Sequence, residues 1–153
     1  MSGGSRHADA WDSPGFLLWH ATLRWQRAMA EALAPHSLTH VQFVLLASTW
    51  WLCEHAEPPR QRDLAEHAGT DPMMTSQVVR ALEAKGVLVR EVDPDDRRAW
   101  RLRPTRDGKA LARRAVAAVE AADTAYFDQV PTRSRAGWNA GLAALGARPT
   151  RVG

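Results

Sequence analysis

Residues 60–103 read RQRDLAEHAGTDPMMTSQVVRALEAKGVLVREVDPDDRRAWRLR, and this stretch decides the fold. Its first half predicts two short helices, because Gly69 is typical of a helix end and Asp71 followed by Pro72 is typical of a helix start. Only a tight turn separates the two helices. That spacing is typical of a helix-turn-helix.

The second half of the stretch predicts a β-hairpin. Residues 87–92 are rich in β-branched side chains, and 99–103 form a second short run that can pair with them. The Asp-Pro-Asp-Asp sequence at 93–96 favours a turn between the two strands. Two short strands around a basic turn, directly after a helix-turn-helix, indicate a wing.

The flanking sequence is helical in pattern. Apolar residues recur near every third or fourth position over 14–34, from Thr39 onward, over 105–130 and over 132–145. Thr39 and Gln42 form a capping box at the start of the second of these helices. We therefore expect a mainly α fold with a two-stranded β-wing.

Composition fits one globular domain of 153 residues with a formal net charge of +3. Arginines cluster in and around 60–103, while Lys85 and Lys109 are the only lysines. Such clusters suit phosphate binding, although the Arg and Ala bias of a GC-rich genome is an alternative explanation. The single cysteine and the absence of a long apolar segment predict a cytoplasmic protein.

The second helix of the helix-turn-helix has two distinct faces. Thr75, Val78, Val79 and Leu82 mark a core stripe, and the opposite stripe carries polar and flexible side chains suited to base edges and thymine methyl groups. The alternative is an ordinary solvated helix face. The members of the opposite stripe are Met73, Ser76, Gln77 and Arg80.

The wing tip has the sequence Asp95-Asp96-Arg97-Arg98. If Asp96 binds a guanidinium group or backbone amides, it can hold Arg97 extended. An extended arginine suits a narrow minor groove, where the negative potential is enhanced. The alternative is a charged hairpin turn with no such role.

These motifs together resemble the MarR family of regulators. The resemblance rests on 61–67, on 75–86, on the Asp-Pro-x-Asp-Arg-Arg wing at 93–98 and on the Thr-x-x-Gly helix start at 105–108. The order of elements matches from about residue 14 to residue 146. The wing followed by the helix start is the most specific part.

The resemblance implies a homodimer that binds a pseudo-palindromic operator, with one recognition helix in each major groove and one wing arginine in each minor groove. In the family, a ligand or cysteine oxidation commonly relieves repression. The implied organisation is a flexible N-terminal arm at 1–13, dimerisation helices at 14–36 and 106–146, a DNA-binding region at 38–105 and a C-terminal tail at 147–153.

Carried over to this chain, the resemblance implies that Ser76 and Gln77 read bases and that Arg97 enters the minor groove. Two departures stand out: Met73 and Met74 replace a small polar pair, and Pro104 predicts an early end to the second strand of the wing. The full set of expected DNA-binding residues is Arg60, Arg62, Met73, Met74, Thr75, Ser76, Gln77, Arg80, Arg97 and Arg98.

Aromatic residues on the first two helices suggest a site for a small aromatic effector. The expected lining is Phe16, Trp19 and His20 from the first helix with Phe43, Ala47, Trp50 and Trp51 from the second. Core and dimer packing is the alternative explanation for the same residues.

The remaining reactive residues indicate no chemistry. Cys53 is interpreted as an inert thiol, with oxidant sensing as the alternative, and the histidines suggest no metal site. The chain has no phosphate-binding loop, nucleophile elbow or paired-His motif, so we expect neither an enzyme nor a cofactor. The alternative functions are a winged-helix protein-interaction module and a small-molecule-binding protein without DNA specificity.

Overall fold

The computed structural model describes residue 4 and residues 6–146. The expected mainly helical fold with a two-stranded wing is confirmed. The elements are the helices α1 (Pro14–Leu33), α2 (His40–His55), α3 (Gln61–Ala68), α4 (Pro72–Ala84), α5 (Arg106–Phe127) and α6 (Thr132–Leu145), the strands β1 (Leu88–Val92) and β2 (Trp100–Pro104), and the 3-10 turns η1 (Ala10–Asp12) and η2 (Ala34–His36).

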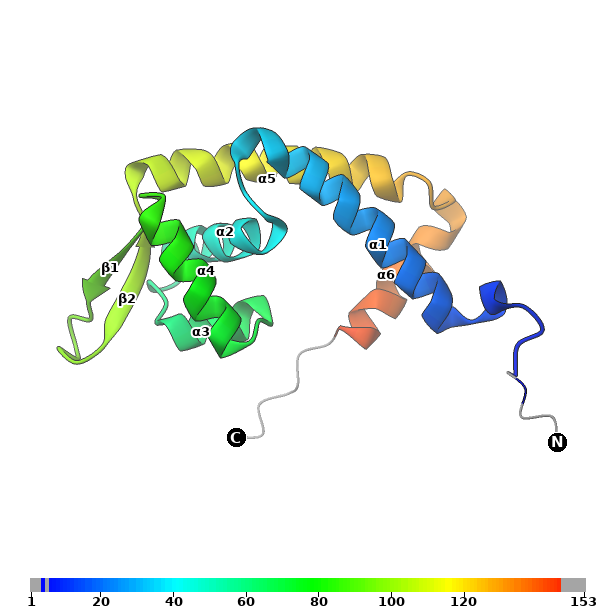
Figure 1. Cartoon of the computed structure of the whole chain (residues 1–153), viewed down its shortest axis with the longest axis horizontal. Helices are drawn as coiled ribbons and strands as arrows, with labels where there is room; N and C mark the ends of the chain where they lie inside the picture. The colour runs from blue at the N-terminus through cyan, green and yellow to red at the C-terminus, as the bar shows by residue number, and fades with distance from the viewer. Residues whose placement is uncertain (1–3, 5, 147–153) are drawn as a thin grey trace.

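Helices α2, α3 and α4 and the hairpin gather at one end of the molecule (Figure 1). Helix α5 starts beside this unit and runs to the other end, where α1 and α6 lie. The winged helix-turn-helix and the helical frame are therefore separate ends of one structure, joined by α5.

Helix α2 is the centre of the core. Its start is fixed by the predicted capping box, in which Thr39 and Gln42 each accept the other's backbone N–H. Leu45, Leu46 and Thr49 are fully buried, and the Thr49 hydroxyl donates to the carbonyl of Leu45 at 2.7 Å. The surrounding core comes from every neighbouring element and includes Met29, Leu33, Leu64, Val79, Leu82, Leu88, Leu102, Ala112 and Ala115.

The two wing strands pair antiparallel, and Pro104 lies within β2 opposite Leu88. The expected early end of this strand is therefore wrong. The N–H of Leu102 donates to Pro59, whereas the N–H of Thr105 donates to Val87. Alternate residues of a strand point their N–H groups to opposite sides, so the missing N–H of Pro104 lies on the side away from β1.

Helices α1 and α5 pack along each other and are tied by two side-chain hydrogen bonds. The indole Nε1 of Trp25 donates to Asp123 Oδ1 at 2.7 Å, and the Tyr126 hydroxyl donates to the carbonyl of Ala21 at 2.7 Å. Helix α6 contains no buried residue. Large apolar side chains stay exposed at this end, among them Leu17, Leu18, Trp19, Trp138, Leu142 and Leu145.

The last part of the expected arm at 1–13 forms a 3-10 turn that contacts α1. Asp9 caps the turn η1, and the Trp11 ring packs at 5.1 Å from Phe16 and at 4.7 Å from His20. The aromatic end of α1 thus holds the preceding turn. The expected tail at 147–153 lies outside the described residues. Of the helices in the described part of the chain, none is long and apolar enough to cross a membrane.

Candidate nucleic-acid interface

The turn between α3 and α4 has the geometry that its sequence predicts. Gly69 adopts a left-handed conformation with a φ of 67°, which a residue without a side chain reaches at little cost. Asp71 then accepts the backbone N–H groups of Met73 and Met74 at 2.8 and 2.9 Å. The turn is therefore rigid, and it fixes how α4 stands on α3.

Helix α4 presents the expected polar face to solvent. Met73 has 72% of its surface exposed, Met74 has 46%, and Gln77 and Arg80 are exposed as well. Ser76 is half-buried. Because Val79 and Leu82 are fully buried on the other side, this face is held outward by the core.

Thr75 is not available to DNA in this structure. Its side chain is fully buried, and its hydroxyl bonds to the carbonyl of Asp71 at 2.8 Å and to the Thr70 hydroxyl at 2.8 Å. The expectation that Thr75 contacts DNA is therefore wrong. Thr75 belongs to the core stripe, where the helical pattern also placed it.

The two arginines near the start of α3 differ in their surroundings. Arg62 is exposed. Arg60 instead binds Asp93 at the base of the wing, through Nε at 2.9 Å and through Nη2 at 2.8 Å. This ion pair occupies two nitrogens of the Arg60 guanidinium, so its first role in the structure is to join α3 to the wing.

Asp93 is the centre of a network at the base of the wing. Its side chain is buried, it accepts the backbone N–H of Asp95 at 2.9 Å, and Arg101 Nε lies 3.0 Å from Oδ2. The N–H of Asp95 and the guanidinium groups of Arg60 and Arg101 stabilise the charged form. Together they outweigh desolvation and lower the pKa of Asp93 from 3.8 to about 2.

The wing tip leaves its two arginines unpaired. Asp96 accepts the backbone N–H of Arg98 at 3.0 Å, which is one of the two arrangements that the sequence suggested. Arg97 and Arg98 are exposed, and neither makes an ion pair with another residue in the described part of the chain. Two free cationic groups therefore stand at the end of a hairpin whose base is fixed.

A second fixed joint connects the wing to α5. The Thr105 hydroxyl donates to the carbonyl of Gly86 at 2.7 Å and accepts the N–H of Gly108 at 3.0 Å. Gly108 is buried so closely against Val87 that a Cβ atom there would lie 1.9 Å from the Val87 carbonyl oxygen. The Thr-x-x-Gly motif thus permits a close approach between α5 and the residue before β1.

The two aromatic groups expected to line one effector site do not meet within a single chain. The rings of Phe16 and His20 lie 4.4 Å apart and pack with Trp11 at 5.1 and 4.7 Å, and Trp19 is exposed. Helices α1 and α2 instead meet through Trp25 and His40, whose rings lie 5.0 Å apart. No ring contact among the described residues joins the two groups, and the expected effector site stays a prediction.

The residues expected from α2 themselves point to different surroundings. Phe43 packs against the core, and Ala47 is half-buried. Trp51 is exposed and stacks on His55 at 4.7 Å and on His67 at 5.6 Å. Trp50 lies under the Arg113 guanidinium, 5.8 Å from its ring centroid, and its buried indole N–H has no hydrogen-bond partner among the described residues.

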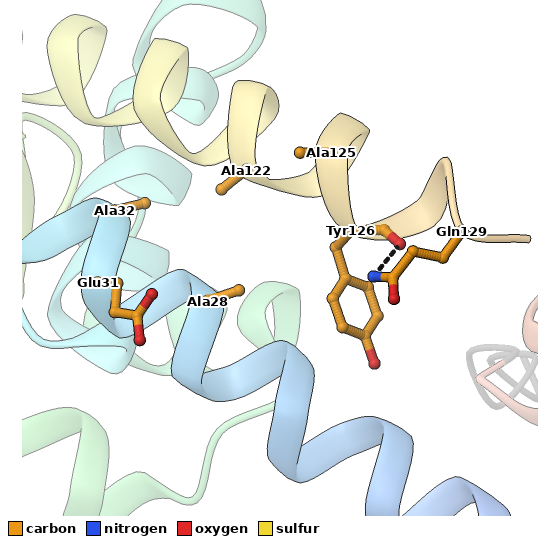
Figure 2. Close-up of a pocket in the computed structure, with 7 residues that line it drawn as sticks. All are labelled: Ala28, Glu31, Ala32, Ala122, Ala125, Tyr126 and Gln129. Atoms are coloured by element: carbon orange, nitrogen blue, oxygen red, sulfur yellow. Dashed lines mark hydrogen bonds between the residues drawn. The ribbon is translucent and has the colours of Figure 1, made fainter.

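A groove of about 420 Å³ lies between α1 and α5 (Figure 2). Its walls are mostly small side chains, and Tyr126 and Gln129 lie at one end, where the Gln129 amide donates to the Tyr126 carbonyl at 2.9 Å. Sequence reasoning missed this groove and the Trp25–Asp123 contact, because both depend on residues about a hundred positions apart. The lining residues are Ala28, Glu31, Ala32, Ala122, Ala125, Tyr126 and Gln129.

The surroundings of the remaining reactive groups favour neither thiol chemistry nor metal binding among the described residues. Cys53 is half-buried with its Sγ 3.7 Å from the Leu102 carbonyl, and burial raises the pKa of the thiol. Within residue 4 and residues 6–146, no cluster of three or more His, Cys, Asp and Glu side chains is arranged to hold a metal ion.

Known proteins resemble this chain in sequence. The profile of the MarR family matches residues 38–100. The chain is 47% identical over 115 residues to the uncharacterised HTH-type transcriptional regulator YdcH of Bacillus subtilis. This alignment covers 75% of this chain and 78% of YdcH.

Solved structures resemble it over nearly their whole length. CouR from Rhodococcus jostii, bound to p-coumaroyl-CoA, is 31% identical with a TM-score of 0.80, covering 94% of this chain and 98% of CouR. CouR on a 23-mer DNA duplex is 25% identical with a TM-score of 0.79, covering 94% and 99%.

The MarR family protein Rv2887 of Mycobacterium tuberculosis, in complex with salicylic acid, is 29% identical with a TM-score of 0.67, covering 91% of this chain and 98% of Rv2887. These relatives are transcriptional regulators and not enzymes. With its winged helix-turn-helix and its identity to such regulators, the chain belongs to the MarR family of DNA-binding transcriptional regulators.

Proposed function

We propose that the protein is a homodimeric, ligand-responsive repressor that binds a pseudo-palindromic operator in the cytoplasm. The observation that carries the proposal is the exposed face of α4 beside a wing whose base is fixed by Asp93 and whose tip carries two exposed arginines without an ion pair among the described residues. A rigid unit of this kind can hold a helix and a hairpin against neighbouring grooves at once.

Each exposed residue of the unit has a proposed role on DNA. Ser76 and Gln77 read base edges in the major groove, and Met73 with Met74 contacts thymine methyl groups. Arg97 enters the minor groove. The phosphate contacts come from Arg62, Arg80 and Arg98, with Arg60 a weaker candidate because Asp93 binds it.

The homodimer is proposed from the exposed apolar surface at the other end of the molecule. Helices α1 and α6 carry Leu17, Trp19 and Leu142 in exposed positions, and α6 buries none of its residues within the chain. A second copy would cover this surface. In such a dimer the two α4 helices would stand about 34–36 Å apart, one turn of DNA.

The effector is proposed to be a small aromatic acid. CouR binds p-coumaroyl-CoA and Rv2887 binds salicylic acid. In this chain Trp50 offers an indole N–H without a partner among the described residues, and Arg113 supplies a positive charge above its ring. The aromatic end of α1, with Phe16, Trp19 and His20, would complete the site only from the partner subunit.

The decisive experiment selects duplexes from a random DNA library with the purified full-length protein and measures binding over a range of salt concentrations. We expect an enriched inverted repeat and an affinity that falls steeply with salt. A protein-interaction module, or a small-molecule-binding protein without DNA specificity, would enrich no sequence. That result would refute the proposed repressor function.

The effector is tested on the same selected duplex. Adding salicylate or p-coumarate should quench tryptophan fluorescence and release the DNA, and a Trp50→Leu variant should respond less to either compound. Unchanged fluorescence and unchanged DNA affinity with both compounds would count against an aromatic acid at this site.

A further inference from the structure

The two faces of the wing carry different side chains. Successive residues of a strand point to opposite faces, so the observed register assigns each cross-strand pair to one face of the hairpin. Arg90 with Leu102 and Val92 with Trp100 share one face. The pairs Val89 with Arg103 and Glu91 with Arg101 share the other face.

The face that carries Trp100 is turned toward the helix-turn-helix. Leu102 on this face is buried in the core. Arg90, opposite it, donates from Nε to Glu83 of α4 at 2.8 Å and from Nη2 to Gln61 of α3 at 3.2 Å. Trp100 is the next residue outward on the same face, between these contacts and the wing tip.

Trp100 and Val92 are not part of the hydrophobic core. Trp100 has 51% of its surface exposed and Val92 has 49%, and they are directly opposite each other. Trp100 takes part in none of the ring contacts found among the described residues. These two exposed apolar side chains lie side by side and offer a small apolar surface to a partner.

The arginines within the two wing strands are neutralised on both faces. On the face of Trp100, Arg90 forms an ion pair with Glu83 at 2.8 Å. On the opposite face, Arg103 is neutralised by Glu91 at 2.6 Å and Arg101 by Glu57 at 2.8 Å. At the tip, Arg97 and Arg98 have no acidic partner of this kind in the described part of the chain. A partner that meets both the apolar pair and the tip should therefore be a polyanion with apolar surface of its own.

We propose that Trp100, with Val92 beside it, packs against the deoxyriboses of the DNA strand that lies between the groove entered by α4 and the groove reached by Arg97. In Figure 1 the wing tip and the lower end of α4 project toward the same edge of the molecule. A DNA backbone offers phosphates for the arginines and sugar C–H groups for an indole. The inference rests on the proposed DNA binding and adds an apolar contact to it.

An apolar sugar contact has a different signature from a phosphate contact. Removing a phosphate contact weakens binding and lowers the slope of log K against log salt by about 1. Removing an apolar contact weakens binding without releasing fewer counterions, so the slope stays the same. The salt dependence therefore separates Trp100 from an arginine, and from a residue that merely positions one.

The test compares the full-length wild type with Trp100→Ala and Trp100→Phe on the duplex that the wild type selects. Trp100→Ala should bind about tenfold more weakly with an unchanged salt slope. Trp100→Phe keeps a ring and should recover most of the loss. Val89→Ala, which removes an exposed apolar side chain from the opposite face of the wing, is the matched control and should bind like the wild type.

Hydroxyl-radical footprinting gives a direct readout, because the radical attacks exposed deoxyriboses. The wild type and Val89→Ala should protect sugars on the strand between the two grooves. Trp100→Ala should lose protection at these sugars and keep the rest of the wild-type footprint. Wild-type affinity for Trp100→Ala, a changed salt slope or an unchanged footprint would each overturn the inference while leaving DNA binding intact. A wild type that selects no duplex would instead refute the proposed function itself.

Discussion

Single side chains at the proposed DNA surface differ in whether the protein already holds them. Arg97 and Gln77 are exposed and free to reach a ligand, Arg60 is held by Asp93, and Thr75 is buried. All four are polar residues in or beside the helix-turn-helix, so residue type alone does not separate them. Exposure and existing contacts decide which can bind DNA.

Arg97→Ala should reduce affinity for the selected duplex by about 5- to 150-fold, since a minor-groove contact of this kind is worth roughly 1–3 kcal/mol. The thermal unfolding midpoint should not change, because the wing tip is exposed. Arg133→Ala, an exposed arginine on α6, is the charge-matched control. Equal losses in the two variants would mean that only net charge matters.

Gln77→Ala should broaden the selected sequence more than it lowers total affinity. The reason is that a bidentate contact to a base edge discriminates among bases, while the phosphate contacts that dominate affinity remain. Repeating the library selection with the variant measures this directly. An identical selected sequence would remove Gln77 from base reading.

Asp93→Asn should lower the thermal unfolding midpoint at pH 7 and weaken DNA binding, because it removes the charge that holds Arg60 and Arg101. The pKa of Asp93 is lowered from 3.8 to about 2, so its charge stabilises the folded state above pH 3.8. That stability is lost as the pH falls through the range from 3.8 to 2. The wild type and the variant should therefore converge in stability toward pH 2.

Unfolding curves at several pH values between 7 and 2 check this convergence. Asp95→Asn is the control, because the Asp95 side chain is exposed and lies 4.0 Å from Arg101. It should differ little from the wild type at any pH. A stability difference between wild type and Asp93→Asn that does not depend on pH would contradict the role assigned to the Asp93 charge.

At the scale of elements, two joints set the position of the wing. One is the Asp93 network with α3, and the other is the close contact between Gly108 of α5 and Val87 before β1. The helix and strand patterns predicted the helices and strands within a residue or two of their observed bounds, except that α5 ends at Phe127 rather than near residue 130. They did not predict these joints, because each one links residues that are distant along the chain.

Gly108→Ala should destabilise the protein by about 1–3 kcal/mol, the usual cost of overpacking, because its Cβ would lie 1.9 Å from a backbone oxygen that cannot rotate away. Gly137→Ala on α6 is the control, since open space surrounds that position. The control should be neutral or more stable by about 0.4–1 kcal/mol. Urea unfolding of both variants measures the difference, and equal stabilities would disprove the close contact.

At the scale of the whole molecule, α5 joins a DNA-binding end to a helical frame with exposed apolar side chains (Figure 1). The frame determines the distance between two recognition helices if it forms the dimer that we propose. The same dimer would bring the aromatic end of α1 to the second subunit. In that proposed dimer, the second subunit would bridge the separation between Phe16 and His20 on one side and Trp50 on the other.

Leu17→Asp should weaken self-association by at least about tenfold, because it places a charge in the proposed apolar interface. Sedimentation at a series of protein concentrations measures the change. Val89→Asp makes the same substitution at an exposed apolar position on the wing and should leave the mass unchanged. A wild type that sediments as a monomer would contradict the proposed homodimer.

The sequence by itself determined the winged helix-turn-helix. Gly69, Asp71, Thr39 and the Asp-rich turn act on neighbouring residues, and local interactions of this kind can be inferred from order along the chain. The tertiary structure alone decided that Thr75 is buried, that Arg60 is held at the wing base and that Phe16 and His20 pack with Trp11 rather than with α2. Those outcomes depend on which surfaces from distant parts of the chain pack together, and local sequence patterns do not specify such contacts.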